Sequence, residues 1–153
     1  MFKEGKIDML EVKIKKLKDK AILPKYQTDG AAGMDISACL DETVTLKPME
    51  RKLISTGFAI AVPDGYAAFL YARSGLASKK GITLPNCVGV VDSDYRGEVK
   101  VALVNLSDEE FLINDGDRIA QMVISPVNQA ILIETDELSE TERAGGGFGS
   151  TGV

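Results

Sequence analysis

Apolar and polar residues alternate with a period of two along several short stretches of this chain. Residues 10–14 place apolar side chains between charged ones, and residues 58–62 place large apolar side chains between alanines, just before a turn at 63–65. A period of two is typical of a β-strand. Alternating or short continuous apolar patterns predict further strands at residues 44–46, 66–71, 99–106, 111–113, 119–124 and 131–133.

Helical signals are few. Only residues 74–80 and the acidic residues 136–143 suit one or two helical turns. Many short strands at close spacing, separated by Asp-Gly turns at 64–65 and 115–116, are typical of antiparallel all-β folds. The chain is therefore predicted to be all-β, a jelly-roll-like β-barrel or sandwich of short antiparallel strands with a mobile glycine-rich C-terminal tail.

The composition fits one globular domain. The 153 residues are 44% hydrophobic and 27% charged. We expect a single domain over residues 1–153, with its core at 8–135 and a flexible lid at 143–153. The net charge of −5 argues against partners such as nucleic acid or anionic membranes. Without an N-terminal apolar run or a membrane-length apolar segment, we expect a cytoplasmic protein.

The chain contains no histidine. This excludes Ser-His and Cys-His nucleophile pairs and leaves Asp, Glu, Lys or Tyr as the only available general bases. Cys39 and Cys87 stand alone and lack metal-ligand spacing. We interpret them as two small buried thiols in a reducing cytosol.

Polar residues with phosphate-binding chemistry follow the predicted strand at 66–71. Arg73, Ser74 and Gly75 come where a helix is expected to begin, and backbone N–H groups, a hydroxyl and a guanidinium together suit a phosphate. Alternatively, Ser74 is an ordinary helix N-cap and Arg73 forms a surface ion pair.

Residues 86–98 are interpreted as a hairpin that carries a functional carboxylate. Asp92 follows an apolar run, so a partly desolvated Asp92 could deprotonate a water or hold a metal through water. It could also simply make a turn. Further along, Gln121 is a neutral donor in an apolar strand, and its partner is either a ligand phosphate or another group of the protein.

The C-terminal residues 143–152 hold five glycines, two hydroxyls, Arg143 and Phe148. Such a segment is either a disordered end or a flexible lid that becomes ordered over an anionic ligand. As a lid, it would bring Arg143 to a phosphate and Phe148 to a flat ring.

Taken together, five segments of the chain resemble the five ordered motifs of the trimeric deoxyuridine triphosphatases, the dUTP pyrophosphatases. The segments are residues 31–35, 73–77, 89–97, 116–121 and 143–152. The resemblance spans nearly the whole domain. One mild departure is Met34, where that family often has Tyr or another apolar residue.

The resemblance implies a jelly-roll homotrimer whose active sites are each built from more than one subunit. The reaction would convert dUTP and water to dUMP and pyrophosphate, with Mg²⁺ chelated by the triphosphate. This would limit uracil incorporation into DNA and supply dUMP for thymidylate synthesis. Asp92 would activate the water that attacks the α-phosphorus. Asp35 would support either the water shell of the metal or only the hairpin.

The resemblance also implies roles for the residues that bind the substrate. The phosphate chain would be held by Arg73, Ser74 and Gly75, and its α-phosphate by Gln121. The uracil edge would be read by Asn86, by the backbone of Gly89, Val90 and Val91, and by Lys100. Tyr95 would pack under the deoxyribose and leave no room for a 2′-hydroxyl. The lid would consist of Phe148 stacked on the uracil and of Arg143, Gly149, Ser150 and Thr151 over the phosphates.

Two alternatives come from other classes of protein. The related dCTP deaminases share the fold but carry a catalytic Glu a few residues past the Gly97 position, where this chain has Ala102. Alanine cannot shuttle protons, which argues against a deaminase. The second alternative is a non-catalytic dUTP-sensing module, but every expected catalytic residue is present.

Overall fold

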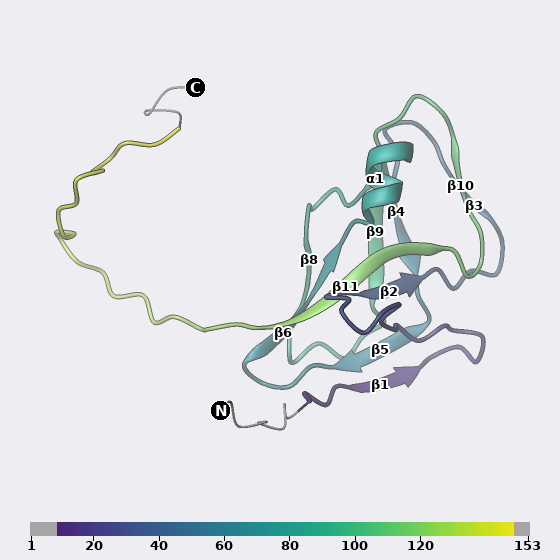
Figure 1. Cartoon of the computed structure of the whole chain (residues 1–153), viewed down its shortest axis with the longest axis horizontal. Helices are drawn as coiled ribbons and strands as arrows, with labels where there is room; N and C mark the ends of the chain where they lie inside the picture. The colour runs from purple at the N-terminus through teal and green to yellow at the C-terminus, as the bar shows by residue number, and fades with distance from the viewer. Residues whose placement is uncertain (1–8, 149–153) are drawn as a thin grey trace, which may run out of the picture.

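The computed structural model describes residues 9–148 as an all-β body with one short helix (Figure 1). In chain order the elements are β1 (Lys13–Lys16), β2 (Met34–Ser37), β3 (Val44–Leu46), β4 (Arg51–Ser55), β5 (Phe58–Ala61), β6 (Tyr66–Tyr71), α1 (Ser74–Lys80), β7 (Ile82–Thr83), β8 (Gly89–Val91), β9 (Lys100–Asn105), β10 (Phe111–Ile113) and β11 (Arg118–Pro126).

The strands form four small antiparallel sheets. The largest has the order β2-β11-β6-β8, and a three-stranded sheet has the order β4-β9-β7. Two further pairs are β1 with β5 and β10 with β3. Neighbours in these sheets are far apart in sequence, as expected of a jelly roll and not of a meander. The predicted all-β, jelly-roll-like class is confirmed.

One hydrophobic core joins the two larger sheets. Strands of both contribute buried side chains, and these include Ile36, Leu70, Met122, Ile54, Val101 and Leu103. The alternation predicted from the sequence is visible in β9, where residues 101 and 103 are buried while 100 and 102 are not. A core of this kind holds the strand ends rigid, which is what a site built on loops requires.

Several predicted elements agree with the structure. The boundaries of β3, β6, α1 and β10 are those expected from the sequence. The helix α1 ends at Gly81, whose φ of 68° is left-handed and whose N–H bonds the Ala77 carbonyl. Glycine adopts that conformation without strain, so the residue that ends α1 could be predicted from the local sequence.

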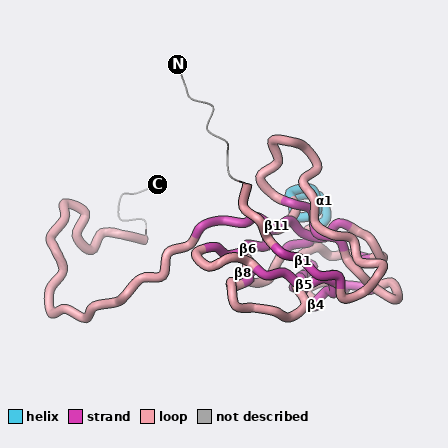
Figure 2. The backbone as a smooth tube through the Cα atoms, turned by 90° about the horizontal axis from the view of Figure 1, so that it is seen from below, coloured by secondary structure: helices cyan, strands magenta, loops and turns pink. Residues whose placement is uncertain are grey.

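Two predicted elements beyond β11 are wrong. Residues 131–133 form no strand, and residues 136–143 form no helix. Ile131, Leu132 and Ile133 are 83–93% exposed, so within the described part of the chain this apolar run has no strand to pair with. The acidic segment has no core to pack on, and an isolated helix of eight residues is unstable in water. Figures 1 and 2 show this whole segment running away from the body as a loop.

The predicted hairpin at residues 86–98 is also wrong. Strand β8 pairs with β6, whereas β9 pairs with β4 and β7. The segment between them, residues 92–99, is therefore a loop that crosses from one sheet to the other. Both flanking strands bury apolar residues, so each joins a different wall of the core instead of its neighbour in sequence.

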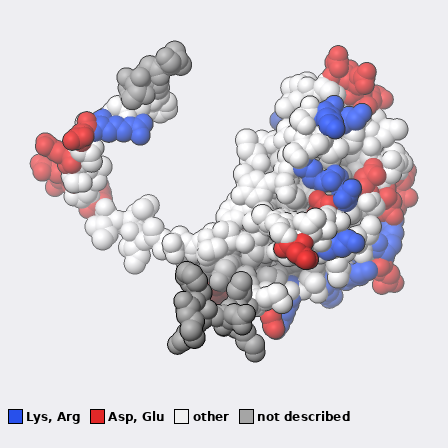
Figure 3. Space-filling model, in the orientation of Figure 1, with Lys and Arg blue, Asp and Glu red and all other residues white. Residues whose placement is uncertain are grey.

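The surface of the body carries both signs of charge. Lys and Arg side chains alternate with Asp and Glu on the face that Figure 3 shows. Among residues 9–148, no helix is long and apolar enough to cross a membrane.

Candidate active site

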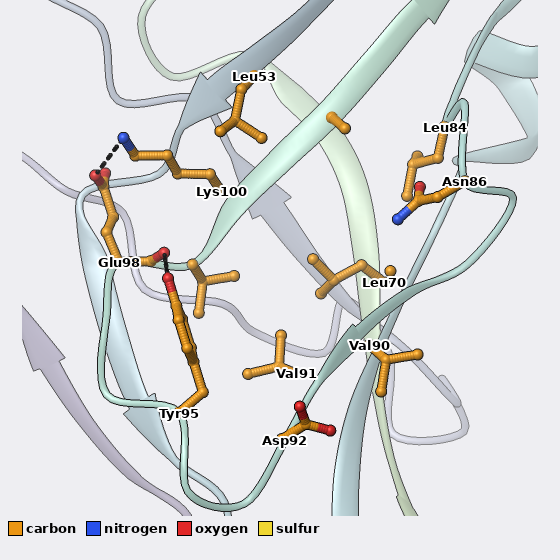
Figure 4. Close-up of a pocket in the computed structure, with 13 residues that line it drawn as sticks. Leu53, Leu70, Leu84, Asn86, Val90, Val91, Asp92, Tyr95, Glu98 and Lys100 are labelled. Atoms are coloured by element: carbon orange, nitrogen blue, oxygen red, sulfur yellow. Dashed lines mark hydrogen bonds and ion pairs between the residues drawn. The ribbon is translucent and has the colours of Figure 1, made fainter.

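A cavity of about 290 Å³ lies where the loop 92–99 passes from β8 to β9 (Figure 4). Its lining contains seven residues that the sequence singled out, namely Asn86, Gly89, Val90, Val91, Asp92, Tyr95 and Lys100. The remaining lining is mostly apolar and comprises Leu53, Leu70, Leu84, Glu98, Val99 and Ala102. Apolar walls with a few polar groups are typical of a small-molecule site.

The backbone of β8 supplies hydrogen-bonding groups to this cavity. β8 is the last strand of its sheet, so one edge pairs with β6 and the other edge keeps its donors and acceptors. A Cβ at Gly89 would lie 3.1 Å from Leu70 Cβ, which leaves little room for a larger residue there. Val88 N–H bonds the Asn86 carbonyl at 2.6 Å and holds the preceding loop close to the strand.

Tyr95 stands on the opposite side of the cavity from Asn86 in Figure 4. Its hydroxyl donates to the Glu98 carbonyl at 3.0 Å, and its N–H bonds the Asp92 carbonyl at 3.2 Å. The ring packs on Gly97, where a Cβ would lie 2.7 Å from Tyr95 Cζ and closer still to Oη. The glycine is therefore required for the ring to reach its place.

Asp92 directly follows β8 and lines the cavity. The carboxylate was expected to be partly desolvated, but the residue is exposed in this chain, so that expectation is wrong for the single chain. The reason is that Asp92 begins the turn that Tyr95 closes, and turns lie at the surface. Asp92 therefore belongs to a turn and also lines a cavity, and its role as a base stays a prediction.

Glu98 is the second carboxylate of the cavity, and it was missed by the sequence analysis. Partial burial raises the pKa of Glu98. Hydrogen bonds from the Ser55 hydroxyl and the Gly57 N–H, together with nearby Lys100, lower this pKa by more than burial raises it. The net pKa is below the usual value, so Glu98 is a carboxylate at neutral pH.

A second group of predicted residues gathers around Asp35 on β2. One carboxylate oxygen, Oδ1, lies 3.2 Å from Arg73 Nε, and the other lies 3.0 Å from Arg118 Nη1. Arg73 Nη1 also donates to the Arg118 carbonyl at 3.2 Å. Asp35 is mostly buried, so it holds two guanidinium groups side by side at fixed positions. Arg118 was not among the predicted site residues.

The alternatives left open for this group can now be resolved in part. Ser74 is the first residue of α1 and not its N-cap, because Arg73 occupies the N-cap position. Arg73 does form the ion pair that the alternative expected. Gln121 donates to the Ala72 carbonyl at 3.1 Å, so its amide has a partner within the protein. Its Oε1 lies against Gly33, where a Cβ would be only 2.7 Å away.

The predicted site residues do not all meet within one chain. The residues around Asp35, including Arg73 and Gln121, do not line the cavity beside Asp92. Arg143 donates to the Gly146 carbonyl at 2.7 Å, and Phe148 is fully exposed on the segment that leaves the body. Gly149, Ser150 and Thr151 lie outside the described residues.

Metal-binding side chains do not cluster in the described part of the chain. Across residues 9–148, no three His, Cys, Asp or Glu side chains are placed to hold an ion together. Both oxygens of Asp35 face guanidinium groups, and support of a metal's water shell by Asp35 stays a prediction.

A jelly-roll domain with an apolar cavity at a strand edge, a carboxylate at its rim and a separate pair of arginines is suited to a nucleotide. A family model described as dUTPase matches residues 19–152. A deoxyuridine 5′-triphosphate nucleotidohydrolase of Hydrogenobaculum sp. (strain Y04AAS1) is 54% identical over 144 residues, which are 94% of this chain and 99% of that protein. The chain belongs to the dUTPase family.

Solved structures agree with this assignment. A mutant dUTPase of Staphylococcus bacteriophage 80alpha, solved with dUpNHpp, has a TM-score of 0.86 at 29% identity and covers 95% of this chain and 100% of its own. A mutant dUTPase from phage phi11 of S. aureus, whose structure describes the coordination of a structural Mg(II) ion, has a TM-score of 0.76 at 27% identity. It covers 84% of this chain and 98% of its own.

Proposed function

We propose that this protein hydrolyses dUTP to dUMP and pyrophosphate. The observation that carries the proposal is the cavity in which the free edge of β8, Asn86 and Tyr95 surround an apolar floor and Asp92 stands at the rim. The membership of the dUTPase family and the names of the relatives support the same substrate.

Asn86 and the backbone of β8 recognise the uracil, and Lys100 contributes to the same recognition. Uracil presents alternating acceptor and donor groups that a strand edge can match, whereas cytosine reverses part of this pattern and leaves buried groups unpaired. The apolar walls, which include Leu70 and Leu84, contact the base and sugar. Tyr95, fixed by Gly97 and by its bond to Glu98, packs under the deoxyribose and excludes a 2′-hydroxyl.

Hydrolysis needs a base for the water and neutralisation of the phosphate charge. Asp92 accepts a proton from the water while the oxygen of that water attacks the α-phosphorus, and pyrophosphate leaves. Arg73, Ser74, Gly75 and Gln121 hold the phosphate chain. Arg73 is pre-positioned for that task because Asp35 fixes its guanidinium.

Because these two groups lie apart within one chain, we propose a homotrimer in which neighbouring subunits complete each site. The arginines around Asp35 of one subunit would face the cavity beside Asp92 of another. Residues 131–133 expose an apolar run on a segment that leaves the body, and such a run is suited to pack on a neighbour. The lid with Arg143 and Phe148 would reach a neighbouring site in the same way.

Magnesium fits this picture as part of the substrate. In the proposed site, the triphosphate itself would hold Mg²⁺, with water completing its shell. The ion supplies charge neutralisation at the phosphates when it is bound. Cys39 is buried as expected, whereas Cys87 is exposed, so the expectation of two buried thiols is wrong for Cys87. Both thiols are free, which fits the cytoplasm as the compartment.

The two alternatives remain weaker. A dCTP deaminase needs a carboxyl group that can hold a proton near neutral pH. Ala102 contributes only a methyl group to the cavity, and the pKa of Glu98 is lowered. A non-catalytic dUTP-sensing module would bind dUTP without releasing pyrophosphate, which one assay separates from an enzyme.

The test is pyrophosphate release with dUTP, dTTP, dCTP and UTP, in parallel with light scattering. We expect release with dUTP to be far faster than with the other three nucleotides, and we expect the mass of a trimer. The matched variant is Asp92→Asn, which should stay folded and bind dUTP but lose roughly 10²–10⁴-fold in turnover. Binding of dUTP without turnover would favour the sensing module, and a fully active monomer would refute the shared site.

A further inference from the structure

Glu98 holds the loop 92–99 to the rest of the protein. Its Oε1 accepts hydrogen bonds from the Ser55 hydroxyl and from the Gly57 N–H, the latter at 2.8 Å. Its Oε2 lies 3.6 Å from Lys100 Nζ, an ion pair drawn in Figure 4. Ser55 ends β4, and Gly57 lies in the tight turn that leads to β5. One carboxylate therefore ties the end of the loop to the turn between β4, which pairs with β9, and β5.

Backbone contacts next to Glu98 keep β9 in place independently of its side chain. Val99 N–H bonds the Phe58 carbonyl at 2.9 Å, and the Thr56 hydroxyl bonds the Val99 carbonyl. Strand β9 is also paired along its length with β4. A substitution of the Glu98 side chain should therefore leave the fold intact and act mainly on the loop.

Tyr95 connects Glu98 to the cavity. The Tyr95 hydroxyl donates to the carbonyl of Glu98 itself at 3.0 Å. Arg96 bonds the Ser93 and Tyr95 carbonyls, so the loop is internally stiff. If the backbone at Glu98 shifts, the acceptor of the Tyr95 hydroxyl shifts with it, and so does the ring.

We propose that Glu98 is a positioning residue that sets the Tyr95 ring and thereby the selection of deoxyribose over ribose. The inference rests on the proposed function, because it assigns Tyr95 to the sugar of dUTP. Glu98 acts only through the loop, by holding its end against Ser55 and Gly57. The charge that it presents to Lys100 is not what selects the sugar.

The test compares the ratio of kcat/KM for dUTP to kcat/KM for UTP between variants. An added hydroxyl is rejected by a fitted pocket about 10²-fold, so a loosened Tyr95 in Glu98→Ala should lower the ratio roughly tenfold. Glu98→Gln keeps an oxygen that accepts from Ser55 and Gly57 but removes the charge facing Lys100. It should keep the ratio within about twofold of the parent.

Glu50→Ala is the matched control. Glu50 also accepts a backbone hydrogen bond at a turn, from Lys47 N–H at 2.8 Å, and lies 3.3 Å from Lys52 Nζ, but it does not line the cavity. Removing it should leave the ratio unchanged. If Glu98→Ala does not fold, Ser55→Ala removes one of the two bonds to Oε1 and should lower the ratio by about threefold.

Equal losses of both substrates in Glu98→Ala would show a merely structural role and overturn the proposal. A ratio in Glu98→Gln as low as in Glu98→Ala would also overturn it, since the charge would then matter. Failure of the proposed function looks different, because the parent itself would release no pyrophosphate from dUTP. In that case the ratio of dUMP to UMP affinity, measured by calorimetry on the same variants, tests the positioning role.

Discussion

Replacing Gly97 with alanine should displace the Tyr95 ring from the cavity wall. The new Cβ would lie 2.7 Å from Tyr95 Cζ, so the ring must withdraw by about 1 Å to reach an ordinary contact. That movement breaks the 3.0 Å bond from the Tyr95 hydroxyl to the Glu98 carbonyl, which contributes about 1 kcal/mol. Overpacking adds about 1 kcal/mol, at the low end because Tyr95 is 44% exposed and can swing outward.

The free energy of unfolding should therefore fall by about 2 kcal/mol, which corresponds to a Tm lower by about 4–8 °C for a domain of this size. The assay is a double-mutant cycle with Tyr95→Ala, at one protein concentration throughout. Without the ring, Gly97→Ala should cost nothing and can gain about 0.5 kcal/mol, because Gly97 has no positive φ and alanine restricts the unfolded chain. An equal cost in both backgrounds would refute the clash as the reason for glycine here.

Three further predictions concern other parts of the molecule. Asp35→Asn should raise the KM for dUTP and lower the Tm, because Arg73 and Arg118 would face each other without a carboxylate between them. Steady-state kinetics measure the KM and thermal melts measure the Tm. An unchanged KM would mean that Asp35 does not position Arg73. Deleting residues 144–153 should leave the Tm of the body unchanged but reduce turnover of dUTP, whereas undiminished turnover would show that the tail is only a disordered end. The pKa of Glu98 is lowered in the folded state, so the contribution of Glu98 to the free energy of unfolding is present above the ordinary pKa of 4.5 and is lost as the pH falls through the folded pKa. In urea melts, the difference in stability between the parent and Glu98→Gln should therefore shrink on acidification, and a constant difference would contradict this.

The sequence predicted those elements whose signals are local. Strand β6 has a turn before it and a helix start after it, and α1 ends at a glycine, so their boundaries needed no knowledge of the fold. Strand β4 was missed because Arg51 and Lys52 open it and Leu53 is exposed, which hides the alternation. The apolar run at 131–133 has a strand pattern but finds no strand to pair with among the described residues.

Pairing partners could not be predicted in the same way. Periodicity says which residues face the core, but it does not say which sheet a strand joins. Residues 86–98 were therefore interpreted as a hairpin, although the two strands that flank the loop 92–99 belong to different sheets. Glu98 and Arg118 were missed for the same reason, since their partners Ser55 and Asp35 are 43 and 83 residues away.

Under the proposed function, the guanidinium pair around Asp35 would let an acidic chain bind a triphosphate. Two free arginines would lose side-chain freedom when the ligand arrives, and that entropy would weaken binding. Asp35 fixes both in advance, and because one carboxylate neutralises only one of the two charges, a net positive charge is left for an anion. The net charge of −5 therefore says little about the site, since what acts on the phosphates is the local charge within a Debye length of about 8–10 Å. A carboxylate between two arginines would thus favour phosphate binding in the proposed site, because it holds both cations in place before the anion arrives.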